Sequence, residues 1–248
     1  MGKKYFTMSF DDGLEQDKKL LKLMKTYSLK GTFNLNGGLF GEKNRVARIG
    51  DIGFMEMPEQ AIIRRKLFKN CDHHRIPEDE IKQVYEGVEV ASHAFKHEAI
   101  ARLSEQKVNE SLNKDIEVLS RIMGCQIRGH AYPGGFSSDT AEKCLQENQL
   151  IYGREAFTDN LYTFPNNPLR FKPTCSHKSK NLFDLFDKFL GAETEDDLLF
   201  VMWGHSYEFD YGTQYCSWDR IETFFKHASG HQELTYCTNK EAFESYML

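Results

Sequence analysis

Side chains that can bind metal ions and transfer protons follow four apolar segments of the sequence. Two adjacent carboxylates, Asp11 and Asp12, come directly after the apolar segment 5–10. Adjacent carboxylates at a strand end repel one another and lose solvation, so we expect a compensating group opposite them. The other segments end in "SHAFKH" (92–97), which contains His93 and His97, in "GHAYPGG" (129–135), and in "LLFVMWGH" (198–205), which ends at His205.

These residue types are sufficient for metal-assisted hydrolysis. One carboxylate and two imidazoles separated by three residues can hold a divalent cation and leave positions open for water and substrate. The cation would neutralise one aspartate and leave the other free beside it. Because a bound metal acidifies water, the free carboxylate could take the proton. His205, on another strand, could then protonate the leaving group.

The hydrophobic pattern predicts a fold that brings the ends of these strands together. Apolar or alternating segments alternate with amphipathic ones along most of the chain. The helix expected at 104–124 begins after Ser104, a good N-cap residue, and ends at Gly124. The other expected helices are 15–29, 78–87, 137–150 and 217–229, and the expected strands are 5–10, 32–36, 88–94, 126–133, 151–157, 169–174 and 198–205.

This alternation predicts a parallel α/β fold, and the number of units favours a barrel. Ligands in such folds bind at the carboxyl ends of the strands, so the four polar strand ends predict one shared site. We expect a single domain over 1–248. Residues 38–80 look irregular and rich in glycine and charge, so they are interpreted as an insertion over one face of the barrel.

Composition excludes several classes of function. The net charge is −5, which gives no electrostatic basis for binding nucleic acid or an anionic membrane. No apolar run approaches the roughly 20 residues of a membrane helix. No secretory signal is visible and the six cysteines form no CxxC pair, so we expect reduced thiols and a cytoplasmic location.

Four ordered motifs resemble those of the polysaccharide deacetylases, the NodB-homology or carbohydrate esterase family 4 group. They are "SFDDG" (9–13), "SHAFKH" (92–97), "AYPGG" (131–135) and "WGHSYEFD" (203–210). The resemblance implies a distorted (β/α) barrel of about seven parallel strands.

The resemblance also implies roles for single residues. Asp11 would be the general base and His205 the general acid, while Asp12, His93 and His97 would hold one divalent ion. Zn is the first choice, with Co, Mn, Ni or Fe compatible with the same ligands. The implied reaction is hydrolysis of an acetyl group, N-acetyl before O-acetyl, from a saccharide. A backbone N–H near Pro133 and Gly134 would help to stabilise the oxyanion.

The sequence departs from the family pattern at the arginine that pairs with the base, because that position is Ala131. Arg170 is the first candidate to replace it, and Arg128 the second. Trp203 is expected either in the acetyl pocket or in the core. Four aromatic residues could either stack on sugar rings or pack in the interior: Tyr132, Phe136, Tyr207 and Trp218. Either Glu208 or Asp210 could orient His205, and "DHHR" (72–75) looks like a metal-binding fragment without a spaced partner.

Two alternatives remain open from the sequence. Relatives of this fold hydrolyse linear or cyclic amides and imides, often without the same metal ligands, and the Asp12, His93 and His97 set argues against that reading. A non-catalytic carbohydrate-binding relative would have lost its base or acid, whereas Asp11 and His205 are both present.

Overall fold

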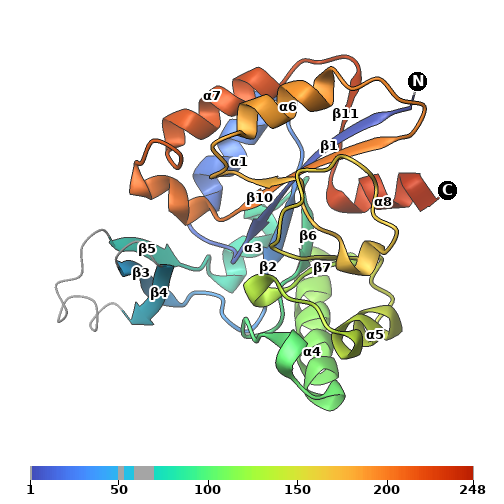
Figure 1. The fold of residues 1–248 in the computed structure, drawn as a ribbon. Helices are drawn as coiled ribbons and strands as arrows, with labels where there is room; N and C mark the ends of the chain where they lie inside the picture. Colours follow the sequence, from blue (N-terminus) through green and yellow to red (C-terminus); the bar gives the residue numbers. More distant parts are fainter. Residues whose placement is uncertain (1, 50–52, 59–69, 248) are drawn as a thin grey trace.

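The protein is built around one parallel sheet that curls into a half-barrel. The computed structural model describes residues 2–49, 53–58 and 70–247. Seven strands follow the order β8-β7-β6-β2-β1-β10-β9, and β11 pairs beside β1, all in parallel (Figure 1). Their bounds are β1 Lys4–Asp11, β2 Thr32–Leu35, β6 Glu89–Ser92, β7 Gly129–Ala131, β8 Tyr152–Arg154, β9 Cys175–Ser176, β10 Leu198–Gly204 and β11 Leu234–Tyr236. The predicted barrel of about seven parallel strands is therefore confirmed.

The centre of the sheet is formed by β1 and β10, whose register runs from Lys4 opposite Leu198 to Phe10 opposite Gly204. Nearly every side chain of both strands is buried, as expected for parallel strands covered on both faces. Phe6, Phe186 and Phe200 pack together beneath the helices. This rigid centre ends at Asp11 and next to His205, so it fixes the position of both residues.

Helices cover the outside of the half-barrel (Figure 1). The α-helices are α1 Asp17–Thr26, α3 Glu78–Val84, α4 Glu105–Met123, α5 Asp139–Glu147, α6 Leu182–Leu190, α7 Trp218–Ala228 and α8 Asn239–Met247. The short 3₁₀ turns are η1 Ile100–Arg102, η2 Pro133–Gly135, η3 Pro168–Arg170 and η4 Ser206–Tyr211. Of these turns, η2 and η4 directly follow strands β7 and β10, so they lie at the carboxyl edge of the sheet.

One expectation about these elements is wrong. Residues 169–174 do not form a strand: the segment begins in η3, and its β-pairing with the sheet is an isolated bridge between Arg154 and Phe171. Pro173 and the turn at Asn167 explain this, because both interrupt a continuous ladder. Ser104 is the N-cap residue of α4 as predicted, although its side chain makes no capping hydrogen bond, and the helix ends at Gly124 in the left-handed region.

The described part of the segment 38–80 is not irregular. Strands β3 Lys43–Ile49, β4 Gly53–Pro58 and β5 Asn70–His74 form an antiparallel sheet in the order β4-β3-β5. Figure 1 shows this sheet projecting from one side of the barrel. Leu14, Val46, Cys71 and Tyr207 form a small apolar cluster that connects it to the barrel. The many charged residues of these strands hide the alternation on which a strand prediction depends.

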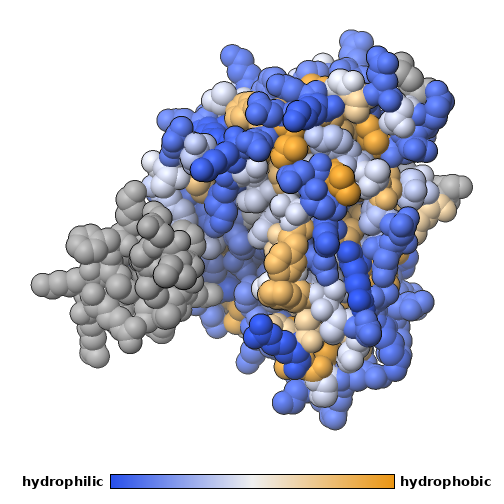
Figure 2. Space-filling model, viewed as in Figure 1, coloured by the Kyte–Doolittle hydropathy of each residue, from blue (hydrophilic) through white to orange (hydrophobic). Residues whose placement is uncertain are grey.

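The face of the barrel seen in Figure 2 is predominantly hydrophilic, with apolar side chains interspersed among charged ones. Phe136, Phe157 and Leu161 are among the large apolar side chains that reach solvent. Among the described residues, no helix has the length and apolarity that crossing a membrane requires.

Candidate metal centre and catalytic site

Asp12, His93 and His97 come together at the carboxyl edge of the sheet. Asp12 follows β1, and the two histidines follow β6. Nε2 of His97 lies 3.6 Å and Nε2 of His93 lies 3.8 Å from Oδ1 of Asp12. One donor atom from each residue lies within 4.8 Å of the others. A carboxylate and two imidazoles at this spacing are a donor set that divalent transition metals accept.

The surroundings of the Asp12 carboxylate favour a bound cation. Its Oδ1 atom is buried and has no hydrogen-bond partner among the described residues. A buried carboxylate oxygen without a partner is costly, and a cation beside it would remove that cost. Burial raises the pKa of Asp12, but the hydrogen bond from His73 and the charges of His97 and His205 outweigh burial and hold the pKa well below its usual value. The residues present therefore fit a metal ion.

The ring of His93 is set up as a neutral ligand. Its Nδ1 lies 2.7 Å from the carbonyl oxygen of Ala131, which can only accept, so Nδ1 carries the hydrogen. Burial lowers the pKa of His93 to about 4, with the carboxylates of Asp11 and Asp12 opposing the shift. Nε2 therefore presents a free lone pair towards Asp12, which is the form of imidazole that binds metals.

Asp11 is paired with Arg154, not with Arg170 or Arg128. Nη2 of Arg154 lies 2.5 Å from both carboxylate oxygens of Asp11, and Asn34 Nδ2 donates to Oδ1 at 2.7 Å. Arg154 is 1% exposed and lies at the carboxyl end of β8. Burial raises the pKa of Asp11, but the charge and hydrogen bond of Arg154, together with the charges of His93 and His205, outweigh burial and lower the pKa, so Asp11 is ionised.

The prediction that Arg170 supports Asp11 is wrong because of where its segment lies. Arg170 is in η3, on the outside of the half-barrel, where it forms ion pairs with Asp139 and Glu142 of α5. Arg128 precedes β7, at the opposite end of that strand from the metal centre, and lines a surface groove with Gly87 and Glu244. Neither arginine takes the place that Arg154 occupies.

His205 completes the site from the end of β10. Its Nε2 lies 3.9 Å from Oδ2 of Asp11, and its Nδ1 lies 3.4 Å from Oε2 of Glu208. Burial lowers the pKa of His205, but the hydrogen bond and charge of Glu208, together with Asp12 and Asp11, raise it to about 9. Of the two predicted orienting acids, Glu208 contacts the ring, whereas Asp210 accepts from Gln16 and Trp218.

The remaining predicted substrate residues lie at the same edge but differ in what they can contact. Trp203 is half-buried, and its ring lies 5.7 Å from that of His205 and over the guanidinium of Arg154. Pro133 is buried, whereas Gly134 is exposed with open space above it. Tyr132 is 2% exposed and donates to the Leu169 carbonyl, so the alternative that it stacks on a sugar ring is wrong.

Several residues that the sequence analysis missed hold the loop that carries the two histidines. The buried carboxylate of Asp115, on α4, accepts from Ser92 Oγ at 2.6 Å and from the backbone N–H of His93 at 3.2 Å. Asn36 donates to the carbonyls of His93 and Ala94. These contacts keep the loop in place although Ala94 and His97 both have positive φ, which is unfavourable for residues other than glycine.

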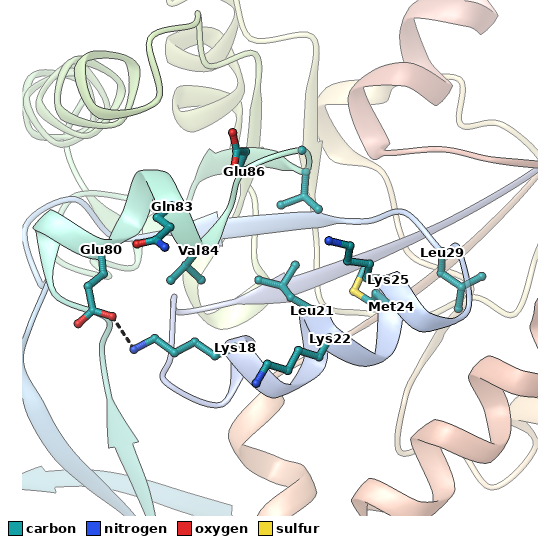
Figure 3. A pocket seen from close by; sticks show the side chains of 12 residues that line it. Lys18, Leu21, Lys22, Met24, Lys25, Leu29, Glu80, Gln83, Val84 and Glu86 are labelled. Atoms are coloured by element: carbon teal, nitrogen blue, oxygen red, sulfur yellow. Dashed lines mark hydrogen bonds and ion pairs between the residues drawn. The ribbon is translucent and has the colours of Figure 1, made fainter.

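A groove on the outer surface is separate from this site. It lies between α1 and α3, encloses about 680 Å³, and has an apolar floor that includes Leu21, Met24 and Val84 (Figure 3). Lys18 and Glu80 form an ion pair across one end. None of the metal-centre residues lines this groove.

Comparison with known families now gives the chain a class. At the carboxyl edge of the α/β half-barrel lie a carboxylate and two imidazoles that fit a metal ion, and a third histidine, His205, beside them. The family model for polysaccharide deacetylases matches residues 1–152, and the chain belongs to this family. Membership supports a hydrolytic enzyme that acts on acetyl groups. No curated protein matches the sequence.

Solved structures agree on the fold. A probable polysaccharide deacetylase from Pseudomonas aeruginosa has a TM-score of 0.66 at 14% identity, covering 98% of this chain and 90% of that one. Puue allantoinase has a TM-score of 0.64 at 14% identity, covering 98% and 89%. A family 4 acetyl xylan esterase from Clostridium thermocellum, in complex with a cobalt ion, has a TM-score of 0.52 at 16% identity, covering 98% and 92%.

Proposed function

We propose that this protein is a metal-dependent hydrolase that removes acetyl groups, N-acetyl in the first place, from a saccharide. The observation that carries the proposal is the placement of Asp11 and His205. Their side chains lie 3.9 Å apart and border the Asp12, His93 and His97 set. An ionised carboxylate and a protonated imidazole are thus available next to the atoms that would hold the metal.

When held by Asp12, His93 and His97, a divalent ion supplies Lewis acidity towards the acetyl oxygen and towards water. Zn²⁺ is our first choice for this donor set, and Co, Mn, Ni and Fe are compatible with it. The acetyl xylan esterase with its cobalt ion supports a divalent ion in this family.

Proton transfer is assigned to the protein's own side chains. Asp11, ionised and held in place by Arg154 and Asn34, accepts the proton of the attacking water. His205, whose pKa is raised to about 9, is protonated at neutral pH and donates to the departing nitrogen. An amine leaves poorly without this proton, so the acid matters more for an N-acetyl than for an O-acetyl substrate.

Substrate contacts come from the same edge of the sheet. Trp203 lies beside His205 and forms one wall for the acetyl methyl group. A backbone N–H in the turn at Pro133 and Gly134 helps to stabilise the oxyanion. We further propose that residues 1–248 form one domain with 38–80 as an insertion, because β5 packs against η4, which directly follows His205.

Acetate release by the purified protein tests this function. A panel of N-acetylated and O-acetylated saccharides is assayed without chelator, with chelator, and after Zn²⁺ is restored. The Asp11→Asn variant is assayed on the same panel. We expect acetate to appear, to vanish with chelator and to return with metal. Asp11→Asn should retain its metal and lose at least about 100-fold in rate, the usual contribution of a general base.

Other results would overturn the assignment. If neither the chelator nor Asp11→Asn lowers the rate of acetate release, the metal centre and the general base assigned here are wrong. Allantoin belongs in the panel because one structural neighbour is an allantoinase. Hydrolysis of allantoin without any acetate release would replace the deacetylase by an amide hydrolase.

A further inference from the structure

The "DHHR" segment (72–75) places one histidine against the metal centre. The proposed reaction assigns no role to this segment. His73 lies on β5 of the inserted sheet, and its ring is buried. Its Nε2 lies 3.1 Å from Oδ2 of Asp12. An ionised carboxylate can only accept, so Nε2 of His73 carries a hydrogen and donates it.

The two oxygens of Asp12 therefore have different neighbours. Oδ2 accepts from His73, whereas Oδ1 faces Nε2 of His93 and Nε2 of His97 at 3.8 and 3.6 Å. Rotation of the carboxylate would break the contact with His73. The backbone of Asp12 is also fixed, since its N–H donates to the Asn34 carbonyl while φ is +82°.

The insertion is anchored so that His73 stays in this position. Glu15 N–H donates to the His74 carbonyl at 2.9 Å, and Ile76 N–H donates to the Gly13 carbonyl at 3.0 Å. These two bonds join β5 to the chain directly after Asp12. On its other side, the ring of His73 packs edge-on against Tyr207, with centroids 4.9 Å apart.

We propose that His73 is a positioning residue that fixes Asp12 as a one-oxygen metal ligand, so that the inserted sheet β3–β5 is part of the metal centre. This inference rests on the metal centre of the proposed function. Partners that hydrogen-bond to a ligating carboxylate orient it, and their removal typically weakens metal binding by about 10- to 100-fold.

Two substitutions separate this role from packing. His73→Phe keeps a ring against Tyr207 but removes the N–H donor. His73→Gln loses the ring but can still present an N–H to Oδ2. His74→Ala is the matched control, because His74 is the next residue on β5 and its side chain points to the opposite face of the strand.

Zn²⁺ is titrated into the metal-free proteins by calorimetry, and urea unfolding of the same samples checks that they are folded. We expect His73→Phe to bind about 10- to 100-fold more weakly. His73→Gln should stay within a few-fold of the unsubstituted protein, and His74→Ala should match it.

Equal affinity in His73→Phe and the unsubstituted protein would overturn the inference and leave the proposed function intact. Weak binding in His73→Gln together with tight binding in His73→Phe would assign His73 to packing and would also overturn it. If the unsubstituted protein itself binds no Zn²⁺, the metal centre of the proposed function fails as well.

Discussion

Arg154, the arginine that pairs with Asp11, shows how far a single functional residue can be predicted from the sequence. Arg154 and Asp11 are 143 positions apart, and no local pattern joins them. A signal did exist, because Arg154 lies within the strand expected at 151–157, and a charge at the end of a buried strand requires a partner. The same criterion that selected His93 and His205 would have selected Arg154. Arg170 has no such constraint, since its segment lies outside the sheet.

Substitution of the two arginines should have very different effects on stability. Arg154→Met leaves the carboxylate of Asp11 buried without its main partner, and breaking a buried pair in this way costs about 3–5 kcal/mol. Arg170→Met removes ion pairs near the surface, which contribute at most about 1 kcal/mol each. The free energy of unfolding in urea measures both losses. Equal losses of unfolding free energy would show that the Asp11–Arg154 pair stabilises the fold no more than the ion pairs of Arg170 do.

At the scale of elements, the prediction was most accurate where local signals are strong. The helix at 104–124 has an amphipathic pattern and a closing glycine, and the structure has α4 there. Strand β9 has two residues and exists only through its pairing with β10, so no periodicity could reveal it. The inserted sheet was missed because charged residues hide the alternation of its strands. The contact between His73 and Asp12 was missed with it, since that contact depends on backbone hydrogen bonds between β5 and the loop after β1.

The start of α1 contains a buried carboxylate that links two helices. Oδ2 of Asp17 accepts from the hydroxyl of Tyr85, after α3, at 2.6 Å and from the Leu14 N–H at 3.1 Å. Burial raises the pKa of Asp17 to about 7, and the hydrogen bonds from Tyr85 and Leu14 offset burial only in part. The native state therefore binds this proton more tightly than the unfolded chain does.

The contribution of Asp17 to the free energy of unfolding should consequently fall as pH rises through this range. Below about pH 4 Asp17 is protonated in both states, and between pH 4 and pH 7 the unfolded chain loses its proton first, which favours unfolding. The cost reaches at most about 4 kcal/mol above pH 7. Asp17→Asn removes this titration, so the difference in unfolding free energy between variant and unsubstituted protein should shift in favour of the variant from pH 4 to pH 7. A difference independent of pH would contradict the raised pKa.

At the scale of the whole molecule, the site joins segments that are far apart in the chain. Asp12 follows β1, His93 and His97 follow β6, His73 comes from the inserted sheet, and His205 follows β10. The order of motifs predicted that these strand ends would meet, because parallel strands place their carboxyl ends at one edge. It could not predict distances or partners, since those depend on how the half-barrel curls and on loops such as the one held by Asp115.

A metal bound at this junction should stabilise the entire fold, because the unfolded chain does not hold its ligands together. Free Zn²⁺ at 100 times its dissociation constant should add about 2.7 kcal/mol, or about 5–10 °C in melting temperature. His97→Ala should abolish this shift and cost little stability by itself, because the side chain of His97 is 37% exposed. His227→Ala, on a histidine 39% exposed in α7, is the control and should keep the full shift. Thermal unfolding with and without Zn²⁺ gives the result, and a shift that persists in His97→Ala would place the stabilising ion elsewhere on the protein.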